Sequence, residues 1–175
     1  ISPSEERFIQ KDINSKFGSK IYEKVKNNYQ LIVAEGKWKS IFLVPPQIIE
    51  IFNKIKGKDT PIFIGIHFGD LLKNQFKIQI AALELISDYT KKYVILTGKG
   101  EQTALYGRNI PLALIKKVEP RIKKDEFVIV RNELKESIAL GKFLIDSENL
   151  SKITNRNKII IKIIMDLGEY LRKER

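Results

Sequence analysis

Four short apolar segments follow one another in the second half of the chain, and they constrain its fold more than any other feature. They are YVILT from Tyr93, EFVIVRN from Glu126, IALGKFLI from Ile138 and KIIIKIIM from Lys158. Each has the length of an ordinary strand and is rich in β-branched residues, and polar turn-forming residues lie between them. Short strands at this spacing predict a small barrel-like β domain.

The first half of the chain has a different pattern, in which helices alternate with strands. Ser2 as N-cap, Pro3 at the first helical position and Glu5 three residues after the cap predict a helix that ends near Gly18. We then expect, in order, a helix at KIYEKVKNN, two strands around a turn in YQLIVAEGKWKSIFLVPP, a helix in PPQIIEIFNKIKGKD that stops at Gly57, and strands in PIFIGIHFGDLL and FKIQIAAL. The two halves together predict an α+β fold with an N-terminal α/β domain built on a mainly antiparallel sheet.

The charge of the chain is divided unevenly between these halves. Residues 1–90 hold 13 Lys and Arg against 10 Asp and Glu, a net charge of +3, whereas residues 91–175 hold 19 against 11, a net charge of +8. We therefore place the domain boundary between residues 90 and 91. Because no low-complexity linker separates the halves, we expect two closely packed domains.

The whole chain of 175 residues carries a net charge of +11, which favours a polyanion, and first of all a nucleic acid, as its partner. Because the chain contains no cysteine, disulfide frameworks and thiolate metal sites are excluded, and a reducing compartment such as the cytoplasm is compatible. No stretch approaches the roughly 20 apolar residues that span a bilayer. We expect no membrane partner, no signal peptide, no cofactor and no small-molecule substrate.

The stretch KYVILTGKGEQTALYG has three glycines after a strand and raises the possibility of a phosphate-binding loop. Gly98 and Gly100 are followed by Thr103 where the dinucleotide fingerprint requires a third glycine, and no window fits the P-loop pattern. A nucleotide site is therefore disfavoured. Two interpretations remain open: a turn with a positive-φ glycine that joins a strand to a short helix, or a loop that contacts RNA.

Catalysis has one candidate, His67, which is the only histidine. Asp70 follows three residues later, but in a regular strand the two side chains lie on opposite faces of the sheet. A metal site is not expected, since no second histidine exists to complete one. We interpret His67 as structural and predict no catalytic residue.

Basic residues recur through the second half and are the better candidates for function. Lys152, Arg156 and Lys158 lie in SENLSKITNRNK, where amide and hydroxyl groups accompany the cations just before an apolar strand. This mixture suits contacts to RNA phosphates and riboses, and solvation of a polar loop is the alternative. Lys116 and Lys117 fit a solvated edge strand. Three aromatic residues could stack on bases: Tyr106, Phe143 and Tyr170. We interpret them instead as core residues.

Several of these segments resemble a known RNA-binding domain. KKYVILTGKGEQTALYGRNI, FVIVRN, ALGKFLI and IIMDLGEYLRK, in this order, resemble a PUA domain, the fold shared by pseudouridine synthases and archaeosine transglycosylases. With GIHFGDLLKNQFKIQIAALELISDYTKKY added, the chain is similar from about Gly65 to Arg172 to the nuclear import protein seven (Nip-seven) family. Where the family has a Lys-Pro-small turn, this chain has Thr97, Gly98, Lys99 and Gly100.

The resemblance implies a PUA-like β pseudo-barrel over residues 91–175 and a non-enzymatic ribosome biogenesis factor. Such a factor acts on the precursor RNA of the large ribosomal subunit and works with other ribosome assembly proteins. Archaeal members keep a basic RNA-facing segment before the last strand, which here corresponds to Lys152, Arg156 and Lys158 and implies an archaeal, cytoplasmic protein. Lys99 and Arg108, in the stretch that carries the resemblance, complete the expected RNA site.

Two other functions stay open at this point. The first is an RNA-modifying enzyme, or its accessory subunit, with a site near His67. The second is an adaptor whose basic surface binds acidic proteins in a ribonucleoprotein particle. The sequence does not predict which site on the RNA is bound, which bases are preferred or which proteins are partners.

Overall fold

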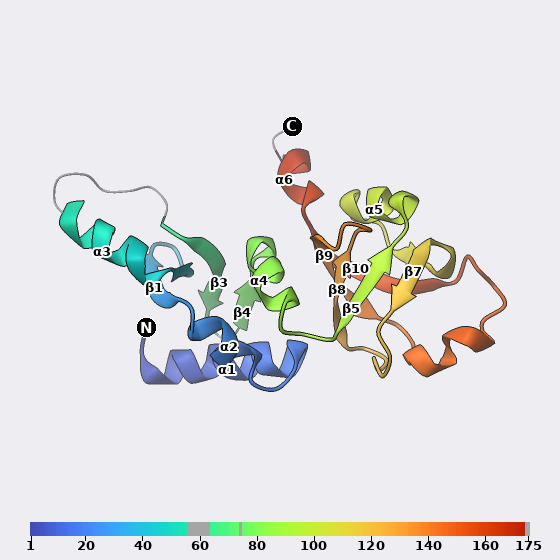
Figure 1. Ribbon diagram of the computed structural model, residues 1–175, viewed down its shortest axis with the longest axis horizontal. Helices are drawn as coiled ribbons and strands as arrows, with labels where there is room; N and C mark the ends of the chain where they lie inside the picture. The colour runs from blue at the N-terminus through green and yellow to red at the C-terminus, as the bar shows by residue number, and fades with distance from the viewer. Residues whose placement is uncertain (56–63, 74, 174–175) are drawn as a thin grey trace.

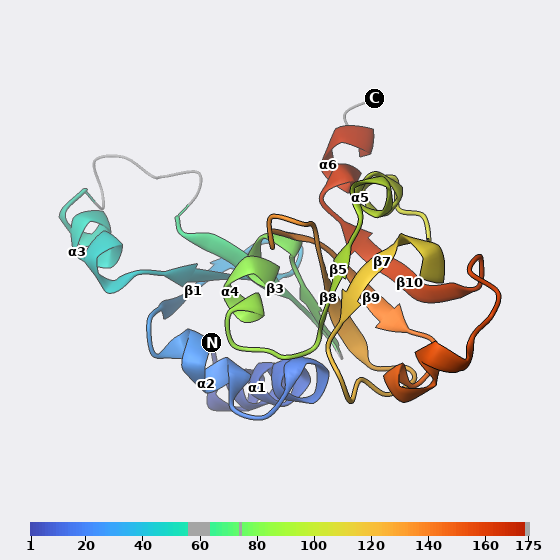
Figure 2. The same cartoon turned by 45° about the vertical axis from the view of Figure 1, so that its right-hand side comes forward.

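The computed structural model describes residues 1–55, 64–73 and 75–173 and contains two sheets that lie side by side along the long axis (Figure 1). The four strands of the first sheet precede the six strands of the second in the chain. The second sheet curves into a barrel-like wall, as the turned view shows (Figure 2). The α+β class, the mainly antiparallel N-terminal sheet and the PUA-like pseudo-barrel are thereby confirmed. The division at residues 90 and 91 stays a prediction.

Two N-terminal helices lie below the first sheet, and the sequence provides a clear cap for the first of them. Helix α1 (Pro3–Phe17) begins with a capping box, in which the Glu5 amide donates to Ser2 Oγ at 3.2 Å and the Ser2 amide donates to Glu5 Oε2 at 2.8 Å. Helix α2 (Ile21–Lys26) follows the C-cap of α1 at Gly18. Ile9, Ile13 and other apolar side chains of α1 are fully buried against the sheet.

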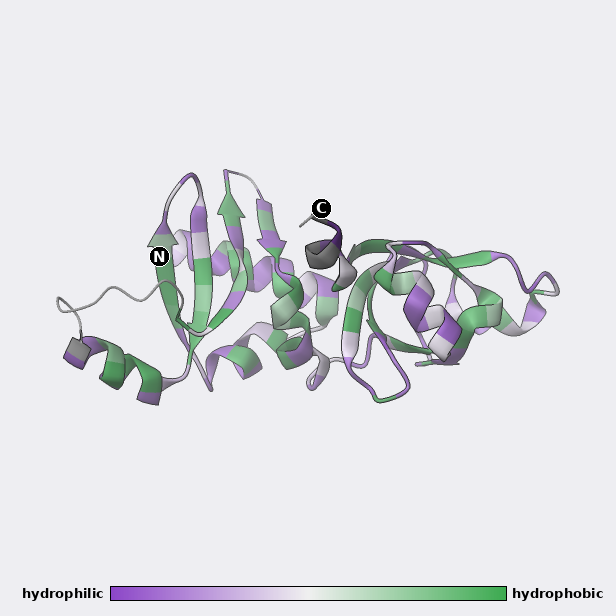
Figure 3. Cartoon of the chain, turned by 90° about the horizontal axis from the view of Figure 1, so that it is seen from above, coloured by the Kyte–Doolittle hydropathy of each residue, from purple (hydrophilic) through white to green (hydrophobic). Residues whose placement is uncertain are grey.

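The first sheet is an antiparallel meander in the order β1-β2-β3-β4. Its strands are β1 (Gln30–Glu35), β2 (Lys39–Val44), β3 (Ile66–Leu72) and β4 (Gln75–Ile78). Helix α3 (Pro46–Ile55) starts where predicted, and its predicted stop at Gly57 lies outside the described residues. Figure 3 colours most of α3 as hydrophobic, and Ile48 and Ile51 are 42% and 55% exposed. The apolar face of α3 is therefore only partly covered.

A bulge in β3 overturns the prediction that His67 and Asp70 lie on opposite faces. Ile41 of β2 pairs with Gly69, whereas the next residue, Phe42, pairs with His67, so that Phe68 is an extra residue in β3. An extra residue reverses the side-chain alternation beyond it. The two side chains consequently lie on one face, with His67 Nε2 3.0 Å from Asp70 Oδ1.

A short helical segment leads from the first sheet to the second. It consists of the 3-10 turn η1 (Ile80–Ala82) and helix α4 (Leu83–Ser87). The strands of the second sheet are β5 (Tyr93–Leu96), β6 (Ile110–Pro111), β7 (Ile115–Val118), β8 (Phe127–Arg131), β9 (Ser137–Phe143) and β10 (Ile159–Asp166). They are ordered β6-β10-β9-β8-β5-β7, and β5 and β8 are parallel while all other pairs are antiparallel. The four apolar segments found in the sequence are thus β5, β8, β9 and β10.

The remaining elements surround the second sheet. Helix α5 (Gly98–Leu105) crosses one end of the barrel, and α6 (Gly168–Lys173) lies near it at the C-terminus (Figure 2). The 3-10 turns η2 (Leu112–Leu114) and η3 (Ser147–Lys152) lie in the connections that follow β6 and β9. The barrel interior is filled by a cluster of buried side chains that includes Val94, Val128, Val130, Phe143 and Ile161.

The core of the first sheet is shared by both halves of the chain, beside the separate cluster inside the barrel. Ile129 and Leu140 of the second sheet belong to the buried cluster that α1 forms with the first sheet. One polar contact crosses the junction, in which the Arg131 guanidinium donates to the Ser87 carbonyl at 2.6 Å. Beside it, Thr90 Oγ1 donates to the Phe17 carbonyl at 2.7 Å and ties the end of the first half to α1. The expectation of close packing without a loose linker is therefore correct.

Candidate nucleic-acid interface

The start of α5 fixes the position of Lys99. Thr97 is the N-cap and accepts a hydrogen bond from the Gly100 amide at 3.2 Å, while its own amide donates to the Leu114 carbonyl at 3.0 Å. Gly98 and Gly100 lie within the first helical turn, and the positive-φ glycine of this region is Gly107 instead. The interpretation of the Gly-Lys-Gly stretch as a positive-φ turn is therefore wrong, because Thr97 caps a helix there.

Gly100 is needed at this position because the helix lies directly on a neighbouring backbone. A Cβ atom at Gly100 would lie 2.7 Å from the Leu114 carbonyl oxygen and 3.0 Å from Leu96 Cβ. At Gly98, two residues earlier in the same turn, a Cβ atom would meet nothing within 4 Å. Lys99 is exposed between them. The close approach of α5 to residue 114 thus places the Lys99 backbone beside the segment that follows β6.

The same segment is hydrogen-bonded on its other side to the predicted basic loop. The Leu112 amide donates to the Lys158 carbonyl, and the Ala113 amide donates to the Arg156 carbonyl, both at 2.9 Å. Residues 112–114 therefore connect the start of α5 with the loop before β10. The structure brings Lys99, Arg156 and Lys158 to one end of the barrel.

Lys152 belongs to the same connection but lies at the end of η3, six residues before Lys158. Its ammonium group donates to Asn149 Oδ1 at 3.1 Å, and its side chain is exposed. Figure 1 shows this connection, in orange, at the far end of the molecule from α3. Lys152, Arg156 and Lys158 therefore stay on one surface connection, although the structure gives no direct contact among their side chains.

Arg108 lies apart from the other four predicted residues. It follows the C-terminal end of α5, and an eight-residue helix is about 12 Å long. Its guanidinium carbon lies 5.9 Å from the centre of the Tyr106 ring. Tyr106 is 69% exposed, so its assignment to the core is wrong, whereas Phe143 is fully buried as expected. The side chain of Tyr170 lies outside the described residues.

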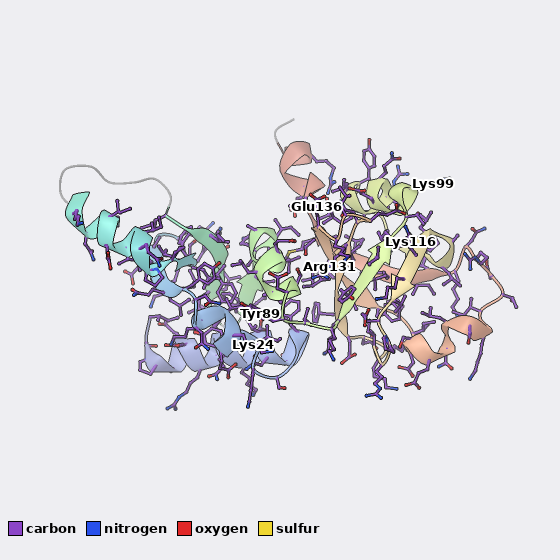
Figure 4. The ribbon with its side chains drawn as sticks, in the orientation of Figure 1. Lys24, Tyr89, Lys99, Lys116, Arg131 and Glu136 are labelled. Atoms are coloured by element: carbon purple, nitrogen blue, oxygen red, sulfur yellow. The ribbon has the colours of Figure 1, made fainter. Side chains whose placement is uncertain are left out.

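The five predicted cations have no partner carboxylate in the described part of the chain, whereas some other basic residues of the barrel are paired. Lys116 pairs with Glu133 at 3.1 Å and Lys117 pairs with Glu119 at 2.6 Å, on the exposed edge strand β7. The hydrogen bond that the Lys117 ammonium donates to Glu119 raises the pKa of Lys117. Among the residues that the structure describes, no ion pair involves Lys99, Arg108, Lys152, Arg156 or Lys158. Within these residues, other exposed lysines of the domain, such as Lys124 and Lys135, are unpaired as well. Figure 4 labels Lys99 and Lys116, which both lie on the barrel.

The polar group around His67 is organised by Asp70. Asp70 Oδ1 accepts from Ser40 Oγ at 2.6 Å and contacts His67 Nε2 at 3.0 Å, and Oδ2 accepts from the Gln79 amide group at 2.8 Å. Burial raises the pKa of Asp70, but these hydrogen bonds outweigh it and hold the pKa below its ordinary value. The His67 ring also stacks on Phe42, with ring centres 4.9 Å apart.

This arrangement does not activate a nucleophile. In a hydrolytic triad the base takes a proton from the hydroxyl, whereas here Ser40 and His67 both bind the carboxylate of Asp70. The group ties β2, β3 and the residue after β4 together. Among the described residues, no cluster of three His, Asp or Glu side chains is arranged to hold a metal ion, and no helix has the length and apolarity to cross a membrane.

No sequence pattern predicts the contact that joins α6 to the end of α5. Arg172 donates to both carboxylate oxygens of the buried Asp166, at 2.9 and 3.0 Å, and also to the Leu105 carbonyl. These residues are six positions apart, a spacing that belongs to no helical pairing pattern. The pair supports the helix end that carries Tyr106 and Arg108.

Solved structures with the same fold come from archaea. A hypothetical protein from the hyperthermophile Pyrococcus horikoshii OT3 superposes over 97% of this chain and 96% of its own length, with a TM-score of 0.63 and 16% identity. A conserved PUA domain protein from Thermoplasma acidophilum covers 99% of this chain and 96% of its own, with a TM-score of 0.62 and 15% identity. At these identities the likeness shows the fold alone.

The relatives that match this chain include eukaryotic proteins. The 60S ribosome subunit biogenesis protein NIP7 homolog of Danio rerio is 24% identical over 135 residues, covering 77% of this chain and 74% of that protein. The 60S ribosome subunit biogenesis protein nip7 of Schizosaccharomyces pombe is 26% identical over 112 residues, covering 63% and 62%.

Two domain families match nearly the whole chain. Residues 1–80 match the NIP7/UPF0113 pre-PUA domain, and residues 92–175 match the UPF0113 PUA domain. The first match covers α1 to β4, and the second covers the six-stranded sheet with the helix and connections that carry the five predicted cations. The chain therefore belongs to the NIP7/UPF0113 family, with a pre-PUA domain followed by a PUA domain.

Proposed function

We propose that this protein is an RNA-binding ribosome biogenesis factor that acts in processing and assembly of the large ribosomal subunit. Its relatives are named 60S ribosome subunit biogenesis proteins, and its second half matches a PUA domain. It binds precursor ribosomal RNA and works beside other assembly proteins without catalysing a reaction. We place it in the cytoplasm of an archaeal cell, with domains of residues 1–90 and 91–175.

The observation that carries this proposal is the unpaired basic surface of the PUA domain. A cation that pairs with a carboxylate has lost much of its attraction for phosphate, whereas an exposed unpaired cation releases counterions from RNA when it binds. Lys99, Arg156 and Lys158 gather around residues 112–114, and Lys152 lies on the same connection. Arg108 with Tyr106 forms a second contact at the other end of α5.

The experiment is a salt titration of binding to single-stranded RNA by fluorescence anisotropy. Each phosphate contact to a single strand contributes a slope of about −0.7 to log K against log salt. Replacing Lys152, Arg156 and Lys158 by Ala is expected to reduce the slope by about 2, which corresponds to a loss of roughly a hundred-fold near 0.1 M salt. The circular dichroism spectrum should not change, since all three side chains are exposed.

The matched control replaces Lys116 and Lys117, which are exposed on the same domain but are paired with glutamates. This double variant is expected to lose far less affinity than the triple variant, because its cations are already neutralised. Equal losses would show that total charge rather than this surface decides binding. Unchanged affinity in a folded triple variant would refute the site.

A catalytic role for His67 is not part of the proposal. The ring is held by Asp70 and Phe42, and the neighbouring hydroxyl of Ser40 binds the same carboxylate. These contacts stabilise the bulged strand β3. RNA that competes with an acidic partner protein for the basic surface would instead favour the adaptor function.

A further inference from the structure

The tip of the β1–β2 hairpin carries an exposed tryptophan, Trp38, which is not part of the proposed RNA surface on the barrel. Glu35 pairs with Lys39, so that Gly36, Lys37 and Trp38 form the connecting loop, closed by a 3.1 Å hydrogen bond from the Gly36 amide to the Trp38 carbonyl. Trp38 is 45% exposed and is the only tryptophan of the chain. A large aromatic side chain left in water at a hairpin tip adds little to the core.

Trp38 lines a cavity of about 880 Å³ between the hairpin tip, the start of α1 and the end of β3. Phe8 of α1, itself 39% exposed, provides a second aromatic ring there. Two half-exposed aromatic rings in one open cavity form a surface on which flat rings can stack.

The charges around this cavity favour an anionic ligand. Glu5 pairs with Lys39 at 2.8 Å, and this hydrogen bond lowers the pKa of Glu5 to about 2, so the two charges cancel. Lys37 lies over the Trp38 ring, with its ammonium group 4.8 Å from the ring centre, and Lys73, just after β3, also lines the cavity. Neither has an ion-pair partner among the residues that the structure describes. Only Glu35 opposes them.

We propose that this cavity is a second RNA contact, in which a base of a single-stranded segment stacks on Trp38 while Lys37 and Lys73 neutralise the adjoining phosphates. Aromatic rings accept any base through stacking, so this contact has little sequence preference. Lys37 has a flexible side chain and moves from the ring to a phosphate when a base enters. The inference shares RNA as ligand with the proposed function but concerns the other domain.

The position of the cavity makes it separate from the PUA surface. Helix α1 reaches from the cavity, at Ser4, to the domain junction, where Lys16 lies over the Phe127 ring of β8. Its 15 residues span about 22 Å. A single RNA strand must therefore cross the junction to reach both surfaces.

The single tryptophan allows a direct test. Stacking of a base quenches the fluorescence of Trp38, so titration with a short uridine oligonucleotide is expected to quench the emission saturably. Polyglutamate supplies negative charge without bases and should leave the emission unchanged. Quenching by polyglutamate to the same extent would indicate an acidic protein ligand and overturn the proposal, as would the absence of quenching at saturating RNA.

Variants separate this inference from the proposed function. Trp38→Ala is expected to weaken binding of a long single-stranded RNA about ten-fold, and Trp38→Phe, which keeps a ring, should restore part of it. Lys11→Ala, an exposed lysine of α1 outside the cavity, is the control and should bind like the unchanged protein. If folded Trp38→Ala binds RNA with full affinity, the cavity contact is overturned, but the proposed function is not.

The triple variant of the PUA domain tests whether the two RNA contacts are independent. In the triple variant of Lys152, Arg156 and Lys158, quenching of Trp38 should persist while overall affinity falls. If quenching persists and overall affinity does not fall, the PUA site is refuted and the cavity stands. If the triple variant abolishes quenching although the protein remains folded, Trp38 only reports RNA bound at the barrel, and the cavity is refuted.

Discussion

Alanine at two neighbouring glycines should have opposite effects on stability, although both lie in the first turn of α5. Neither has a positive φ, so the backbone accepts alanine at both positions. At Gly98 a Cβ atom meets nothing within 4 Å, whereas at Gly100 it lies 2.7 Å from the Leu114 carbonyl oxygen. Cβ atoms in proteins essentially never lie this close to another heavy atom. Because the Leu114 oxygen belongs to the backbone, it cannot move away as the end of a flexible side chain could.

The magnitudes follow from these contacts. Replacing a helical glycine by alanine contributes about 0.5–1 kcal/mol when space is available, so Gly98→Ala is expected to raise the free energy of unfolding by about 0.5 kcal/mol. At Gly100 the same gain is opposed by overpacking that costs about 1–3 kcal/mol. Gly100→Ala should therefore lower the free energy of unfolding by about 1–2 kcal/mol.

Urea denaturation followed by circular dichroism measures both variants, and anisotropy with single-stranded RNA measures the consequence for binding. In Gly100→Ala the helix must move away from residues 112–114, which separates Lys99 from Arg156 and Lys158. RNA affinity should consequently fall in this variant and stay unchanged in Gly98→Ala. Equal stabilities of the two variants would refute the role assigned to the close approach at residue 114.

Three further perturbations test the polar contacts. Because the pKa of Asp70 is lowered in the folded state, its carboxylate stabilises the protein above the ordinary value of 3.8, and this stabilisation is lost as pH falls through the folded pKa. Asp70→Asn should therefore flatten the acid limb of a plot of urea midpoint against pH. His67→Ala should leave RNA affinity unchanged in anisotropy and cost about 1 kcal/mol in urea denaturation, and a loss of affinity without loss of stability would contradict its structural role. Arg172→Ala leaves the buried Asp166 unpaired, and differential scanning calorimetry should show a lower melting temperature; an unchanged one would show that the pair does not fasten α6.

Local signals explain why the helices and strands could be predicted. The capping box at Ser2 and Glu5 joins a side chain to the backbone three residues away, so the sequence alone defines it. The β-branched runs that became β5, β8, β9 and β10 likewise carry their own strand preference. Such features require no knowledge of distant residues.

The bulge in β3 could not be predicted in this way, since it depends on how β2 pairs with β3. The alternation of side chains along a regular strand assigns His67 and Asp70 to opposite faces. The extra residue in β3, seen only in its pairing with Ile41 and Phe42 of β2, brings them to the same face. Gly69 was the available cue, because glycine within a strand often marks a bulge or a close contact. A Cβ atom there would lie 2.5 Å from the Phe76 ring.

The sequence predicts which residues belong to the candidate RNA site, but it does not predict which of them lie close together. Charge asymmetry and the family resemblance selected the cations, whereas the hydrogen bonds of residues 112–114 decide which of them lie together. Arg108 was placed with Lys99 because the two are close in the sequence. Helix α5 separates them, since they lie at its opposite ends.

The shared core determines how two RNA contacts would act together. Arg131 bonds across the junction to the Ser87 carbonyl, and Ile129 and Leu140 of the barrel complete the core that α1 forms with the first sheet. The barrel and the hairpin cavity therefore keep a fixed separation. A fixed separation gives the second contact a defined effective concentration once the first has formed. An RNA long enough to reach both surfaces should therefore bind more tightly than two short RNAs combined, and Trp38→Ala should remove this advantage while leaving short RNA on the barrel unaffected.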